Sequence, residues 1–129
     1  MQHTMTLQPK PFERIRKGQK TIEMRLYDSK RRQIQPGDTI LFTCTASPYD
    51  TLTVQVQSLH IFPDFAALYA ALPLTACGYT EEELPTASPD DMTQYYTPTQ
   101  QKQCGVVGIR IVLMKSSCSD RPAQNAISC

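Results

Sequence analysis

The sequence contains no tryptophan, and its aromatic residues are limited to six tyrosines and four phenylalanines. So few rings argue against a broad stacking surface. The longest apolar run, residues 65–72, has eight residues, well short of the roughly 20 that a membrane span needs. Residues 1–6 are polar and lack the apolar stretch of a signal peptide. We therefore expect a soluble, cytoplasmic protein with no membrane partner.

Signatures of metal and cofactor sites are also missing. The cysteines are odd in number and none is closely spaced with another, which argues against a disulfide framework and against zinc. They are Cys44, Cys77, Cys104, Cys118 and Cys129. No glycine-rich dinucleotide or phosphate-loop motif occurs. We expect no metal and no cofactor, and we expect the cysteines to be free thiols in a reducing compartment.

What the sequence does contain is a strongly segregated charge. The 129 residues, enough for one domain, carry a net charge of only +1. Residues 1–32 nevertheless hold nine basic and three acidic side chains, whereas residues 33–129 hold four basic and nine acidic ones. The first segment is therefore +6 and the second −5. Phosphates are the commonest partner of such a basic region, although a solvated surface paired with the acidic residues near 81–83 and 90–91 would carry the same charges.

Hydrophobic periodicity and turn residues predict a mixed α+β chain. Alternation within residues 20–26 places Ile22, Met24 and Leu26 on one face of a strand. Gly18 suits the end of the preceding helix, and Asp64 suits the start of another. The expected strands are 3–7, 20–26, 39–45, 52–61 and 105–114, and the expected helices are 11–17, 65–72, 90–96 and 98–103.

This order of elements has no long repeat of strand, helix and strand, so it favours a small mixed barrel over a doubly wound sheet. Residues 1–115 would form the domain. Residues 116–129 are polar with little apolar mass, and we expect them to be a flexible C-terminal tail.

Residues 11–31 and 34–42 carry a recognisable pattern. The block Gly18-Gln-Lys-Thr-Ile-Glu-Met-Arg25, followed by the Pro36-Gly-Asp38 turn, resembles the ASCH domain, a family within the PUA-like superfamily of small RNA-associated β-barrels. Residues 92–98 and 105–111 resemble its closing helix and strand. The resemblance implies a closed or nearly closed barrel of five to six strands with short helices at its ends, and a cleft lined by residues 20–25.

The resemblance also implies RNA or a nucleotide-like small molecule as the partner. Some members of the family bind RNA, at least one is a ribonuclease, and one branch hydrolyses the acetamide of N4-acetylcytidine. That branch uses a lysine, a threonine three residues later and a glutamate in a later helix. Lys20 matches the lysine, but Glu23 occupies the threonine position, so the nucleophile is missing. The third position falls in the region of residues 81–83.

The polar face of residues 20–25 supplies the candidate site. Arg25 would bind a phosphate or carbonyl, Lys20 would supply a point charge, and Glu23 would accept from a base amino group or activate water. An ion-pair cluster that orients the barrel would use the same residues. Candidate ligand-binding residues outside this face are Lys30, Arg31 and Arg32 of a basic loop, and Tyr96, which we place in the cleft while Tyr95 packs elsewhere.

Two functions remain. An RNA-binding module would show salt-dependent binding that weakens when residues 30–32 are neutralised. A small metal-independent hydrolase acting on RNA or a modified nucleoside would use Lys20 and Glu23 as its catalytic acid–base pair, provided that burial tunes the pKa of Glu23. Binding is favoured because the mechanistic template loses its nucleophile here.

Overall fold

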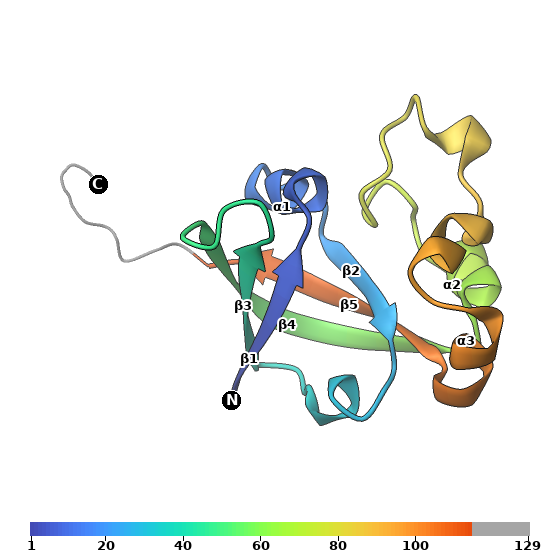
Figure 1. Ribbon diagram of the computed structural model, residues 1–129, viewed down its shortest axis with the longest axis horizontal. Helices are drawn as coiled ribbons and strands as arrows, with labels where there is room; N and C mark the ends of the chain where they lie inside the picture. The colour runs from blue at the N-terminus through green and yellow to red at the C-terminus, as the bar shows by residue number, and fades with distance from the viewer. Residues whose placement is uncertain (115–129) are drawn as a thin grey trace, which may run out of the picture.

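The computed structural model describes residues 1–114, and these fold around a single curled sheet (Figure 1). Its strands have the order β1-β3-β4-β5-β2. The pair β1 and β3 is parallel, and every other neighbouring pair is antiparallel. The sheet is a half-barrel, open between β1 and β2, rather than the closed or nearly closed barrel that the resemblance implies.

The observed elements confirm the predicted α+β class and lie close to the predicted ranges. The strands are β1 (Gln2–Leu7), β2 (Ile22–Leu26), β3 (Thr39–Cys44), β4 (Thr51–Phe62) and β5 (Val106–Leu113). The helices are α1 (Pro9–Arg16), α2 (Phe65–Ala71) and α3 (Pro98–Cys104), with 3₁₀ turns η1 (Arg31–Gln33), η2 (Leu84–Thr86) and η3 (Pro89–Gln94). As predicted, Asp64 caps α2 by accepting from the amide of Ala67. Gly18 follows α1 with a φ of +77°.

Two details differ from the predictions. The first helix begins at Pro9 rather than at residue 11, because the first turn of a helix tolerates prolines that lack an amide hydrogen. The predicted helix 90–96 is a 3₁₀ segment that ends at Gln94. The predicted tail, residues 116–129, lies outside the described residues, as do Cys118 and Cys129. Cys44 and Cys77 are buried free thiols, and Cys104 is half-buried and free.

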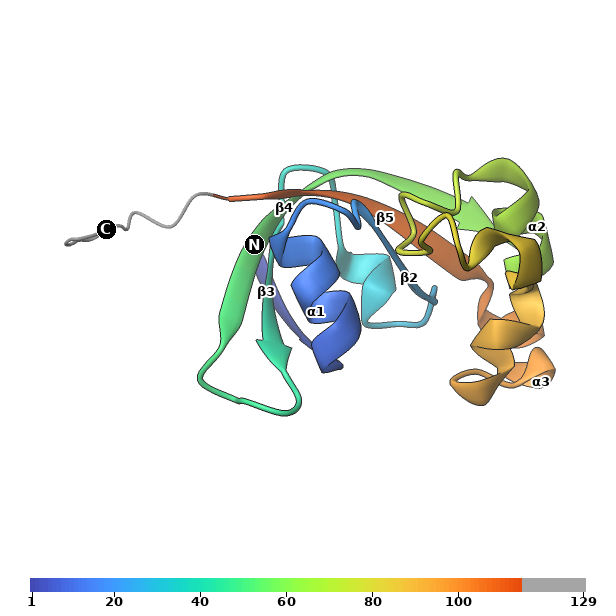
Figure 2. The ribbon, with the colours of Figure 1, turned by 90° about the horizontal axis from the view of Figure 1, so that it is seen from above.

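The concave face of the half-barrel holds the larger hydrophobic core. Side chains that alternate along the strands point inward and meet Phe12 and Ile15 of α1, which lies within the curve of the sheet (Figure 2). Phe12, Ile40, Phe42 and Val54 are at most 1% exposed. This core anchors α1 and the end of β1 beside the open side of the barrel.

A second core covers the opposite face of the sheet at one end. There Phe65 and Leu68 of α2 pack on Ile22, Met24 and Leu26, the apolar face predicted for this strand. Because strand side chains alternate, Glu23 and Arg25 must then face the inside of the half-barrel. The two cores thus fix which way the charged residues of β2 point.

Within residues 1–114 we find no helix with the length and apolar character that crossing a membrane requires.

Candidate functional site

A cleft of about 360 Å³ occupies the open side of the half-barrel, where the edges of β1 and β2 face each other. One wall comes from the end of β1, the start of α1 and the residue after β3. The floor comes from Lys20 and β2, and the other wall comes from the segment around η3. The lining residues are Thr6, Leu7, Gln8, Pro11, Lys20, Glu23, Met24, Arg25, Thr45, Met92, Tyr95 and Tyr96.

The floor of the cleft carries a charged cluster, which we define as Lys20, Glu23 and Arg25. Lys20 Nζ lies 3.1 Å from Glu23 Oε1, and Arg25 Nε donates to Glu23 Oε2 at 2.6 Å. Lys20 and Glu23 are 7% and 4% exposed. The cluster is an internal ion-pair network, and its three residues also line the cleft.

Glu23 is held as a carboxylate. Burial raises its pKa, but the charges of Lys20 and Arg25 and their hydrogen bonds outweigh burial, so the pKa lies below its usual value. This direction of shift does not favour Glu23 as the general base of a hydrolase, because a carboxylate with a lowered pKa is a weaker base. Glu23 is better suited to accepting hydrogen bonds than to taking up a proton.

Side chains close the gap that the backbone leaves between β1 and β2. Arg25 Nη2 donates to the carbonyl of Thr6 at 2.8 Å, and Lys30 Nζ donates to the carbonyl of Thr4 at 2.8 Å. Arg25 is thus engaged through Nε and Nη2, and the part of the chain that the structure describes supplies no hydrogen-bond partner for Nη1. This nitrogen remains available for a ligand.

The basic loop is tied to its own surroundings rather than gathered on the cleft floor. Arg31 pairs with Asp28 at 3.1 Å, and its Nε is buried without a hydrogen-bond partner among residues 1–114. Arg32 lies 4.4 Å above the ring of Tyr27 and donates to the carbonyl of Cys104. Lys30 bonds to the carbonyl of Thr4, two residues along β1 from the Thr6 carbonyl that Arg25 contacts.

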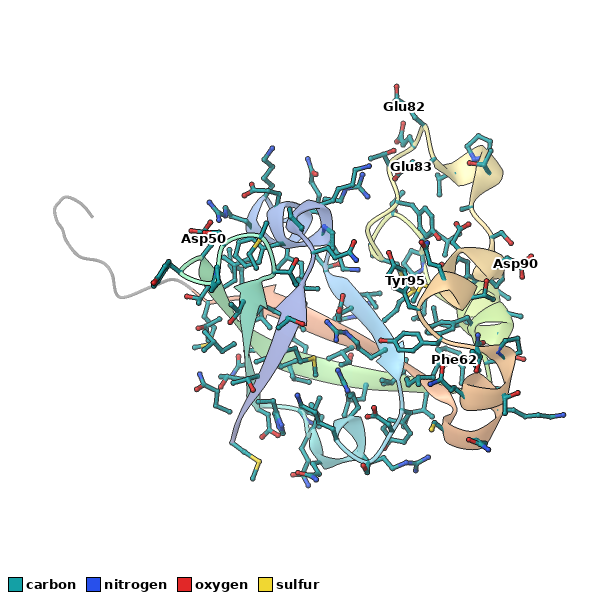
Figure 3. All side chains as sticks on the ribbon, in the orientation of Figure 1. Asp50, Phe62, Glu82, Glu83, Asp90 and Tyr95 are labelled. Carbon is teal, nitrogen blue, oxygen red and sulfur yellow. The ribbon has the colours of Figure 1, made fainter. Side chains whose placement is uncertain are left out.

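Tyr95 and Tyr96 both line the cleft. The sequence placed only Tyr96 there, on the reasoning that consecutive residues of a helix cannot share a face. That reasoning is wrong here because η3 ends at Gln94, and the two rings lie 6.5 Å apart. Tyr96 stacks on Phe65, whereas Tyr95 is 52% exposed and lies between the η3 segment and β2 (Figure 3).

The wall that carries these tyrosines is pinned to α2. Tyr69 and Tyr79 share a hydrogen bond of 2.6 Å between their hydroxyls, and Tyr79 donates to Asp91 at 2.7 Å.

Burial raises the pKa of Tyr96, although the nearby charges of Arg25 and Arg31 oppose that shift. The hydroxyl of Tyr96 therefore stays protonated and can donate a hydrogen bond into the cleft.

Sequence reasoning missed several lining residues, among them Thr6, Gln8 and Thr45. They come from chain segments far apart in sequence, and no local pattern marks them.

A second cavity of about 140 Å³ lies on the other side of Lys20. Glu83 lines it, where it is paired with Arg14 at 3.3 Å, and Figure 3 shows Glu82 and Glu83 in the long loop after α2.

Lys20 is positioned by a glycine as well as by its ion pair. Lys20 Nζ donates to the carbonyl of Cys77 at 2.9 Å. The next residue, Gly78, has a φ of +112°, and a Cβ there would lie 3.2 Å from Lys20 Cδ. This close approach suggests a direct test of how the cluster is held.

We expect Gly78→Ala to lower the free energy of unfolding by about 1–3 kcal/mol for the strained backbone alone, and to displace Lys20 from Glu23. Gly37→Ala is the matched control, because Gly37 has a φ of +93° and no atom within 4 Å of its would-be Cβ. Chemical denaturation compares the two variants. Equal losses of stability would show that the contact with Lys20 contributes nothing.

Residues 5–115 match the family model described as the ASCH domain. No curated protein sequence matches the chain significantly. Within residues 1–114, no group of three or more metal-binding side chains is placed to hold an ion.

Several solved structures share the fold. The crystal structure of hypothetical protein PH0355 is similar with a TM-score of 0.73 and 33% identity, over 88% of this chain and all of that one. Protein PF0455 from Pyrococcus furiosus gives a TM-score of 0.63 and 30% identity, over 88% and 98% of the two chains. An S128A variant of the ASCH protein from Zymomonas mobilis gives 0.62 and 13%, over 86% and 67%, which supports the fold alone.

Proposed function

The chain belongs to the ASCH domain family, and from that premise we propose that it is an RNA-binding module that holds one nucleotide of a single strand in the cleft. The observation that carries this proposal is the charged cluster buried on the floor of the cleft. Two cations and one carboxylate leave this cluster with a net charge of +1, which suits a ligand that combines a phosphate with polar base edges.

The cluster retains free hydrogen-bonding capacity on the ligand side. A carboxylate has about four acceptor positions, and Lys20 and Arg25 each occupy one on Glu23. Glu23 can therefore accept from a base amino group. Arg25 Nη1 is the donor for a phosphate or carbonyl oxygen, and Lys20 adds a nearby positive charge. The same groups provide both donors and acceptors, which a bare phosphate site would not need.

The size and walls of the cleft favour a single unpaired nucleotide. A volume of about 360 Å³ is near the lower end of the roughly 300–1,000 Å³ typical of small-ligand pockets. Unpaired bases are commonly recognised by stacking on aromatic side chains. Tyr95, at the exposed mouth of the cleft, offers such a ring, and Tyr96, fixed against Phe65, offers a rigid wall behind it.

The hydrolase alternative receives less support from the same residues. Glu23 stands where the amidohydrolase branch would need a hydroxyl nucleophile, and a pKa below the usual value weakens it as a base toward water. Glu83, in the region of the third catalytic position, is bound to Arg14 and to the amide of Thr80. We therefore propose recognition rather than reaction.

Tyr95→Ala tests the proposal. We expect it to weaken binding of a fluorescent single-stranded RNA of mixed sequence by about 5- to 150-fold, which corresponds to a stacking contribution of about 1–3 kcal/mol. Fluorescence anisotropy measures the affinity. Tyr49→Ala is the control, because Tyr49 is 96% exposed and does not line the cleft. Wild-type affinity should also fall as salt rises from about 50 to 200 mM.

The same samples are examined for RNA fragments and, after incubation with N4-acetylcytidine, for cytidine. Intact substrates with Tyr95-dependent binding support the module. Products that form with the wild type and are lost in a Lys20→Met variant would show that the protein is a hydrolase rather than a binding module. Equal affinities of Tyr95→Ala and Tyr49→Ala would exclude the cleft as the binding site.

A further inference from the structure

The outer face of the sheet, opposite the cleft, carries a second polar group of side chains that the proposed function does not use. Ser58 of β4 lies directly opposite Arg110 of β5, and His60 lies opposite Gly108. Residues opposite each other in an antiparallel pair point to the same face with Cβ atoms about 4.5–5.5 Å apart. Ser58, His60 and Arg110 are therefore neighbours on this face, and all three are partly exposed.

Arg110 differs from the other arginines of residues 1–114. Each of the others is engaged by a carboxylate, or by an aromatic ring together with a backbone carbonyl. Their partners are Glu83 for Arg14, Glu13 for Arg16, Glu23 for Arg25, Asp28 for Arg31, and Tyr27 and Cys104 for Arg32. Within the described residues Arg110 has no ion pair and no hydrogen bond from its side chain, although it is half-buried.

The groups around Arg110 do not neutralise it. Strand β5 lies between β4 and β2, and the residue of β2 that lies opposite Arg110 is the apolar Ile22. The nearby thiol of Cys77 is protonated at neutral pH, because burial raises the pKa of Cys77 to about 11 while Lys20 and Arg110 lower it only in part. A half-buried guanidinium with no carboxylate partner among residues 1–114 favours an external anion.

Ser58 and His60 add directed donors beside this charge. Ser58 Oγ and His60 Nε2 lie 3.0 Å apart. When the imidazole Nε2 donates to Ser58, the hydroxyl hydrogen of Ser58 is free to point toward an anion. Ser58 and Arg110 are thus adjacent donors on two neighbouring strands.

We propose that Ser58, His60 and Arg110 form an anion site on the outer face of the sheet, and that it binds a phosphate group. The guanidinium fork can donate to two oxygens and the Ser58 hydroxyl to a third, and a phosphate offers at least three oxygens where a carboxylate has two. The phosphate has two possible sources, a free phosphate or phosphate monoester and a phosphodiester of RNA. The site lies on the opposite face from the cleft and does not depend on the proposed function.

Histidine NMR tests this site, because the chain contains only two histidines. Inorganic phosphate is titrated into the protein while chloride keeps the ionic strength constant. We expect the ring signals of His60 to shift to saturation. Those of His3, which is buried and bound to Asp38 at 2.8 Å, should stay in place and act as the internal reference.

Arg110→Gln should weaken the phosphate titration at least about tenfold, which corresponds to about 1.4 kcal/mol. Arg16→Gln removes an arginine that is exposed and paired on α1, and it should titrate like the wild type. Ser58→Ala should weaken binding by a smaller factor. An unsaturable shift of His60, an equal shift of His3, or an unchanged titration of Arg110→Gln would each overturn the proposal.

A competition experiment identifies the source of the phosphate. If single-stranded RNA displaces inorganic phosphate from His60 in the Tyr95→Ala variant, the site accepts a phosphodiester. If a nucleoside 5′-monophosphate displaces it and RNA does not, the site accepts a monoester. Because Tyr95 belongs to the cleft and Arg110 does not, loss of RNA affinity in one variant and loss of phosphate shifts in the other are separate results.

Discussion

Replacing Glu23 with glutamine is expected to lower the free energy of unfolding by about 3–5 kcal/mol. Glu23 is the carboxylate that faces both cations of the cluster, at 3.1 Å from Lys20 and 2.6 Å from Arg25. The amide of glutamine keeps the shape but removes the negative charge. Lys20 and Arg25 then remain buried side by side without compensation. Urea denaturation followed by circular dichroism measures the loss.

The control is Glu13→Gln, because Glu13 pairs with Arg16 while both side chains are about half exposed, and such pairs contribute only about 0–1 kcal/mol. The pH dependence gives an independent check. Since the folded pKa of Glu23 is lowered, its contribution is complete above the usual value of 4.5 and disappears as pH falls through the folded pKa. The stabilities of wild type and Glu23→Gln should therefore converge below pH 4.5. A constant difference throughout that range would contradict the assignment.

A triple variant separates stability from recognition. Lys20→Met, Glu23→Leu and Arg25→Met together replace the buried ions with apolar groups of similar size, an exchange that is often neutral or stabilising. We expect this variant to recover most of the stability lost in Glu23→Gln while losing RNA binding. Retained RNA binding would show that the cluster is structural and that RNA is not recognised by it.

Phe65→Ala is expected to cost about 3–5 kcal/mol of stability and also to weaken RNA binding. Phe65 is fully buried in the second core. Its ring stacks on Tyr96 with centroids 6.0 Å apart and planes 19° from parallel. Removing the ring leaves a cavity behind the tyrosine wall of the cleft, so Tyr96 loses the surface that fixes its position.

Phe42→Ala provides the comparison, since Phe42 is equally buried but belongs to the core inside the half-barrel. Both variants should lose similar stability in denaturation experiments. At a temperature where both are folded, only Phe65→Ala should show reduced affinity for RNA. Equal affinities would mean that Tyr96 is held by other contacts or does not touch the ligand.

Much of the fold could be predicted from the sequence because its signals are local. Alternation identified the apolar face of β2, the proline-containing start identified α1, and Asp64 identified the start of α2. The opening of the barrel could not be predicted in this way. It depends on the backbone of β2 pairing with β5 alone, and on the amides of Thr21 and Ile22 bonding to the distant carbonyl of Ala76.

The candidate site likewise combines residues that a local pattern identifies with features that depend on distant parts of the chain. Lys20, Glu23 and Arg25 share one short segment and one motif, so they could be identified together. Tyr95 was placed outside the cleft because an α-helix was expected to continue through residue 96. The η3 turn ends at Gln94 instead, so α-helical periodicity does not apply to Tyr95 and Tyr96. The direction of the Glu23 pKa shift depends on which of two opposing effects is larger, burial or the two neighbouring cations, and only the distances decide that.

The open side of the half-barrel also bears on how the protein behaves in crowded solution. Unpaired strand edges invite strands of other molecules to pair with them. Here both edges of the sheet, β1 and β2, face each other across the cleft, and Arg25 and Lys30 already occupy carbonyls of β1. Neither strand contains proline. The arrangement that creates the cleft therefore also guards the protein against edge-to-edge aggregation, with charged side chains serving in place of a closing strand.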